Sequence, residues 1–169
     1  MAASTSKKVV IHRFQRERLA GFVNPQTWLK PHGIELLSPD GTLSTTAYSE
    51  IKLVSFVRDF DGPTPFSERR RFHNRPKIEG LWVRAQFLDN DFQEGILTNN
   101  LLQLDPYGFL LVPPDPNTNN QRIFLPTVSL KEFHVIGVSG GSSKRRKADQ
   151  EEVQIGLFEQ TESQGEDQT

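Results

Sequence analysis

The feature that most constrains this chain is an internal repeat within its first 138 residues. Gly33–Asp40 matches Gly108–Asp115 at an offset of 75 residues, and Ser49–Val57 matches Val128–Ile136 at an offset of 79. A third block comes before both of them in each copy. Chance similarity would rarely keep three blocks in one order, so the sequence indicates a duplication with loop insertions.

The third block reads as two short strands joined by a charged turn. The first strand ends at Phe14 in one copy and at Phe87 in the other, an offset of 73 residues. The second strand carries Gly21 and Gly95, an offset of 74. Alternating and short apolar runs then predict five strands in each copy. The expected ranges are 8–14, 18–24, 33–38, 42–47 and 52–58, then 81–88, 91–98, 107–113, 122–126 and 131–138.

Turn chemistry separates these strands, and one-turn 3₁₀ links are expected at 49–51 and 127–129. Five short strands with such a step resemble the SH3-like and Sm-like small barrels. The expected fold class is therefore all-β, with two tandem, duplicated five-stranded barrels. A copy of about 55 residues is near the lower limit for a self-sufficient core, so we expect the two barrels to pack together.

Composition divides the chain further. The expected parts are a flexible start at 1–7, a first barrel at 8–62, a basic linker at 63–79, a second barrel at 80–138 and a disordered tail at 139–169. Residues 1–138 carry 16 Lys or Arg against 14 Asp or Glu, whereas the tail carries 4 against 7. A nearly neutral body is not typical of a nucleic-acid-binding domain.

Location and chemistry are constrained mainly by what the sequence lacks. Cysteine is absent, which excludes disulfides and thiolate chemistry and suits a cytoplasmic setting. No apolar run predicts a signal peptide or a membrane span. The histidines are far apart, no phosphate loop or nucleophile elbow is present, and we expect no enzymatic activity, metal site or cofactor. The oligomeric state stays open.

The linker offers one candidate site. Arg71 and Arg75 have the RxxxR spacing that resembles the arginine motif of PilZ domains, which bind cyclic-di-GMP, and guanidinium groups suit phosphates. The second PilZ element is not found, because Asn90–Gly95 has Phe92 where Ser or Ala belongs. A solvated basic linker, or salt bridges between the barrels, is the favoured interpretation. The Sm-like resemblance adds RNA binding as another alternative, with Arg84 among the available cations.

The tail contains the most specific motif. Gln154, Ile155, Leu157 and Phe158 resemble the bacterial sliding-clamp-binding peptide, with Gly156 departing from its pattern. Two apolar anchors and a glutamine amide suit a groove with a polar rim. The alternative is an extra strand that docks back on a barrel edge. The resemblance implies a non-enzymatic adaptor that joins the sliding clamp in replication or repair.

One resemblance covers the whole body, about residues 8–138. It rests on Glu79–Arg84, Gly108–Leu111 and Pro113–Asp115, with Asn119–Arg122 after them. These blocks look like a bacterial domain family to which no activity is assigned. The resemblance implies a bacterial source, which sliding-clamp binding requires.

Overall fold

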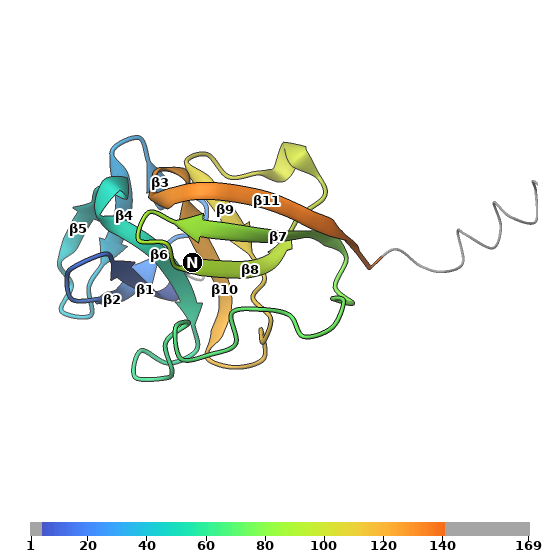
Figure 1. The fold of residues 1–169 in the computed structure, drawn as a ribbon. Coiled ribbons are helices and arrows are strands. Elements are labelled where there is room, and N and C mark those ends of the chain that lie inside the picture. Colours follow the sequence, from blue (N-terminus) through green and yellow to red (C-terminus); the bar gives the residue numbers. More distant parts are fainter. Residues whose placement is uncertain (1–4, 141–169) are drawn as a thin grey trace, which may run out of the picture. The chain divides into compact units, whose positions relative to one another are not determined.

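The computed structural model describes residues 5–140, and every described element is a strand or a short 3₁₀ turn. The first half holds β1 (Lys7–Arg13), β2 (Leu19–Val23), β3 (Leu29–Lys30), β4 (Gly33–Leu37), β5 (Leu43–Thr46), η1 (Tyr48–Glu50) and β6 (Ile51–Val57). The second half holds β7 (Gly80–Phe87), β8 (Phe92–Leu97), η2 (Leu101–Gln103), β9 (Gly108–Leu111), β10 (Asn120–Pro126), η3 (Thr127–Ser129) and β11 (Leu130–Ser139). The all-β prediction is confirmed, and each expected strand has a counterpart in Figure 1.

The two halves pair their strands in the same order. In the first half the order is β5–β4–β2–β1–β6, with β3 also on β4. In the second half β11 pairs with β7, β7 with β8, and β9 with β10, while an isolated bridge from Ile96 to Val112 joins the end of β8 to the end of β9. The η1 and η3 turns lie at equivalent places, just before the last strand of each half. The strand pairs therefore repeat as the sequence blocks do.

The pairing registers repeat residue by residue. Val9 faces Gly21 in the first half, and Val83 faces Gly95 in the second, each 74 positions later. The offset of 73 expected from Phe14 and Phe87 is therefore wrong by one residue. That error arose because Phe14 lies one residue beyond the end of β1, whereas Phe87 is the last residue of β7.

Glycine is needed at the same bend in each half. A Cβ atom on Gly21 would lie 2.5 Å from the carbonyl oxygen of Leu37, and one on Gly95 would lie 2.8 Å from Cβ of Leu111. Only a residue without a side chain lets β2 cross β4, and β8 cross β9, so closely. Two matched glycines therefore fix the curl of the sheet in both halves.

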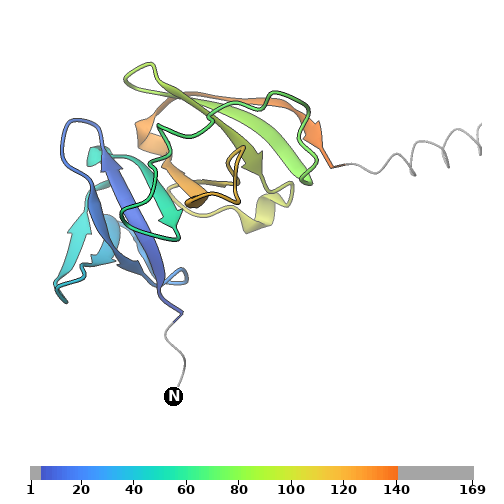
Figure 2. The ribbon, with the colours of Figure 1, turned by 90° about the horizontal axis from the view of Figure 1, so that it is seen from below.

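The halves meet along one seam, where β6 pairs antiparallel with β10 (Figure 2). Each half has its own apolar core, and each core takes one residue from the other half's seam strand. Leu53 of β6 lies in the second core, while Phe124 of β10 lies in the first. The described strands form one compact unit, and their pairs do not show two separately closed barrels, because β5 pairs only with β4 and β11 only with β7.

Candidate functional site

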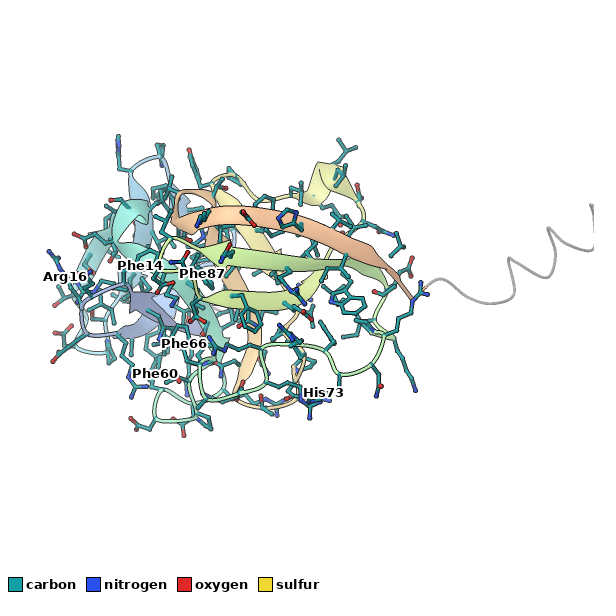
Figure 3. All side chains as sticks on the ribbon, in the orientation of Figure 1. Phe14, Arg16, Phe60, Phe66, His73 and Phe87 are labelled. Atoms are coloured by element: carbon teal, nitrogen blue, oxygen red, sulfur yellow. The ribbon has the colours of Figure 1, made fainter. Side chains whose placement is uncertain are left out.

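The connector between the halves, residues 58–79, packs against strands instead of standing free as a solvated linker. Its first part is aromatic: Phe60 makes an edge contact with Phe22 at 5.4 Å between ring centroids, and Phe66 does so with His12 at 5.3 Å. Figure 3 shows Phe60 and Phe66 beside the strands of the first half, with His73 farther along. The connector therefore shields the faces of these strands that point away from the first core.

The second part of the connector covers a buried acid on β8. Glu94 has no exposed surface, and its Oε1 accepts from Nε of Arg84 at 3.0 Å and from the same guanidinium's NH2 group. Its Oε2 accepts from the backbone N–H of Phe72 at 3.0 Å and from the Trp82 indole at 3.2 Å. The guanidinium of Arg71 lies 3.7 Å from Oε1. Both oxygens of Glu94 are thus engaged, as a buried carboxylate requires.

A second ion cluster lies next to Glu94. The ammonium of Lys52 on β6 contacts Asp89 at 2.6 Å and Asp91 at 3.0 Å, and Arg70 of the connector also pairs with Asp91. Burial raises the pKa of Asp91, but the Lys52 ammonium, with the Phe92 N–H and Arg70, outweighs burial and holds that pKa below its usual range. These acids therefore tie the second half to β6 and the connector.

The structure places the two predicted linker arginines in different surroundings. Arg71 lies near Glu94 and over the Phe92 ring, 5.0 Å from its centroid. Arg75 donates instead to the carbonyl oxygen of Val138 at 2.7 Å. No described contact is shared by these two guanidinium groups. Arg71 therefore has an acidic neighbour within the described residues, and Arg75 has a backbone acceptor.

The titratable residues do not form a metal site within residues 5–140, where no group of three His, Asp or Glu side chains comes together. His12 is buried beneath Phe66, and its Nε2 atom has no hydrogen-bond partner among the described residues. Burial, with help from the charges of Arg18 and Lys52, lowers the pKa of His12 to about 4. A neutral imidazole at this place acts as a packed core residue.

Two neighbouring clefts open on the second half and the seam. The larger, of about 570 Å³, has apolar residues such as Ile96, Leu97 and Val112 along it, with the amides of Asn99 and Gln103. The smaller, of about 320 Å³, reaches Trp28 and Phe56 on the first half and also takes in Lys7 and Gln121. Three residues line both clefts: Asp105, Leu110 and Arg122.

The shared residues make the two clefts one candidate binding surface, which we call the seam groove. Leu110 is half-buried between the clefts, and the exposed Arg122 guanidinium provides a cation beside it. Partial burial raises the pKa of the Asp105 carboxyl above its ordinary value. Apolar walls with a few polar groups are typical of ligand sites in proteins.

Sequence reasoning missed both Glu94 and the seam groove. The sequence places Glu94 only within a possible PilZ element, although an acid in mid-strand opposite Arg84 in a predicted hairpin signals a cross-strand pair. The seam groove gave no signal, because Phe56 and Arg122 are 66 positions apart and meet only through the pairing of β6 with β10. The predicted clamp peptide, Gln154 to Phe158, and the rest of the expected disordered tail from 141 onward lie outside the described residues.

Comparison with known proteins gives one family. A family described as "Family of unknown function (DUF6982)" matches residues 5–137, which is most of the chain. No curated protein and no solved structure matches. Within residues 5–140, no helix has the length and apolar character needed to cross a bilayer.

Proposed function

This chain belongs to the DUF6982 family of unknown function, and we propose that it is a non-catalytic, cytoplasmic adaptor that binds proteins at two places. The first place is the seam groove, which takes an extended polypeptide segment. The second is the peptide from Gln154 to Phe158, which docks on the bacterial sliding clamp. We propose further that the two halves are diverged copies of one SH3-like or Sm-like small barrel, a reading that their common registers support.

The observation that carries the adaptor proposal is the composition of the seam groove. Its apolar stretch can bury aliphatic side chains of a partner, and the amides of Asn99, Gln103 and Gln121 can bond to a partner's backbone. Arg122, at the junction of the two clefts, selects a segment with an acidic residue next to its apolar ones. The carboxylates at the other conspicuous cluster, Asp91 and Glu94, are engaged by cations of the fold.

A displayed library of random peptides tests the groove. The full chain is expected to select peptides that combine apolar and acidic residues, and Arg122→Glu is expected to weaken the selected peptides at least about tenfold, the loss of one charge-assisted contact. Arg18→Glu is the matched control, because it reverses an exposed charge outside the residues that line the groove. Equal binding by both variants, or no selected peptide, contradicts the groove proposal.

The clamp proposal has a separate test with a purified bacterial sliding clamp. A peptide of residues 150–160 and the full chain are expected to bind it, and changing both Leu157 and Phe158 to Ala is expected to abolish that binding, because both apolar anchors are lost. If parent and variant bind equally, or the parent does not bind, docking on the clamp is wrong. That outcome leaves the groove proposal standing, since the two experiments use different partners.

Two other functions remain open to direct measurement. A cyclic nucleotide at Arg71 and Arg75 would have to compete with Glu94 and with the Val138 carbonyl. Titration with labelled cyclic-di-GMP checks this, and binding at micromolar concentration would replace the adaptor proposal. Retention of RNA that weakens steeply with salt would favour the Sm-like alternative.

A further inference from the structure

At the seam, the last strand of the first half, β6, pairs with the next-to-last strand of the second half, β10. β6 pairs with β10 in a defined register: Val54 faces Phe124, Ser55 faces Ile123, and Phe56 faces Arg122. The contact extends beyond the strands, because the Ser129 hydroxyl of η3 donates to the Lys52 carbonyl of β6 at 3.1 Å. The exchange of Leu53 and Phe124 between the two cores makes this a specific joint.

Each half also has a counterpart of the other half's seam strand, and the outer edges of these two counterparts, β11 and β5, are unpaired within the described residues. β11 is the counterpart of β6, since Ile11 faces Val54 and Ala85 faces Phe133, 79 positions after Val54. β5 is the counterpart of β10, because β4 and β9 bind them in one register. Among residues 5–140, β11 pairs only with β7 and β5 only with β4.

Apolar side chains at these two edges lie in water. Leu43 on β5 is 63% exposed and Val135 on β11 is 57% exposed, and Ile136 beside it is 42% exposed. Unpaired edges with exposed apolar residues favour pairing with another strand. The seam register is transferred by adding 79 to each β6 residue and subtracting 79 from each β10 residue. It then places Phe133 opposite Thr45, His134 opposite Ser44, and Val135 opposite Leu43. The transferred register thus pairs the two most exposed apolar residues of these strands with each other.

We propose that β11 of one copy of this chain pairs antiparallel with β5 of a second copy, in the register of the internal seam. The joint uses two different edges of each molecule, so it is heterologous and propagates into a closed ring or an open filament. The proposal is independent of the proposed function, because it uses neither the seam groove nor the clamp peptide.

Charge at the equivalent turn supports this joint. Ser129 and Lys52 meet at the seam, and their counterparts are Glu50 of η1 and Lys131 of β11, each 79 positions away. In the joint between copies, the half-exposed Glu50, which also pairs with Arg16 of its own chain at 3.2 Å, therefore approaches the exposed Lys131 of the other copy. Opposite charges at such a rim favour the correct register over its alternatives.

The experiment measures the mass of the full chain in solution by light scattering and sedimentation over a wide range of concentration. The wild-type chain is expected to associate as concentration rises. Leu43→Arg blocks the β5 edge and Val135→Arg blocks the β11 edge, so each variant alone is expected to be a monomer. An equimolar mixture is expected to form a dimer, because each variant keeps the edge that the other has lost.

The mixing result separates this joint from other forms of association. A symmetric β11–β11 dimer would leave Leu43→Arg associated and would not be restored by mixing. Leu102→Arg is the matched control, since Leu102 is an exposed leucine of η2 outside both edges, and it is expected to associate as the wild type does. A wild-type chain that stays monomeric up to the millimolar range, or variants that associate unchanged, would overturn the proposal. Circular dichroism of each variant checks that the fold is intact.

Discussion

The two halves use one register for their first hairpin but fill one cross-strand position with opposite chemistry. Val10 faces Ala20 in the first half, and 74 positions later Arg84 faces Glu94 in the second. Phe60 and Pro63 of the connector lie near Val10, whereas Arg71 and Phe72 of the same connector lie on Glu94. The residues of the core face and the glycines thus set the backbone pairing in both halves. The residues of the outer face differ between the halves, because each packs against a different part of the connector.

This difference has an energetic consequence for the second half. A buried ion pair costs desolvation that its attraction largely offsets, so it adds little net stability compared with an apolar pair. Once formed, however, removing one partner leaves the other without compensation. The Arg84–Glu94 pair therefore makes the connector's position specific, and the Val10–Ala20 pair has no such dependence.

The largest expected effect is at Glu94. Changing Glu94→Gln leaves the Arg84 guanidinium without its anion and weakens the contacts to Phe72 and Trp82. The expected loss is about 3 kcal/mol of unfolding free energy, the lower end for a broken buried pair, because the Arg84 side chain is 43% exposed and water replaces part of the lost contact. Urea denaturation measures this loss. The control is Glu132→Gln, at a glutamate whose side chain is 52% exposed, with an expected change within about 0.5 kcal/mol.

A double replacement sharpens the same comparison. Arg84→Val together with Glu94→Ala installs the residue pair of the first half, and it is expected to recover part of the stability lost in Glu94→Gln. The recovery stays incomplete, because the Trp82 indole and the Phe72 N–H still lose their acceptor. A double variant no more stable than the single one would mean that the two halves do not tolerate the same pair.

The next effect concerns His12, whose counterpart 74 positions later is Gln86. The pKa of His12 is about 4 in the folded chain against an unperturbed 6.5, so the unfolded state binds more protons between these values. Stability is therefore complete above pH 6.5 and falls as the pH drops toward 4, by about 3 kcal/mol in all.

His12→Gln, the residue of the second half, is expected to remove this slope between pH 6.5 and 4. Asp91, whose pKa is held below its ordinary value of 3.8, contributes at more acidic pH and separates from His12 in the same titration. An unchanged slope in His12→Gln would show that another group titrates with folding in this window.

The sequence was sufficient to predict the repeat and every described strand except the two-residue β3, because alternation and turn residues are local signals. It placed η1 and η3 within one residue and located both second-strand glycines. It did not predict how the halves join, since the pairing of Phe56 with Arg122 depends on which edges meet. It left Arg71 either solvated or in a salt bridge between the barrels, because nothing local showed that Glu94 lies beneath the connector.

The smallest expected effect compares two lysines at one bulge. Lys52 and Lys131 are 79 positions apart, and each stands at the irregularity where its strand leaves the register of the first strand. The Lys52 side chain is only 10% exposed and contacts Asp89 and Asp91, whereas Lys131 is exposed and reaches Asn90. Lys52→Met is therefore expected to cost about 1 to 2 kcal/mol, and Lys131→Met at most about 0.5 kcal/mol.

Parallel urea denaturation of the two variants measures this difference. The bulge alone would make both substitutions equally costly, because the backbone irregularity is the same in each half. A clear loss in Lys52→Met alone would instead assign the stability to the ion cluster that couples β6 to Asp89 and Asp91. Lys131 would then add little to the stability of a single chain, and its exposed ammonium on β11 stays available for the proposed joint with another copy.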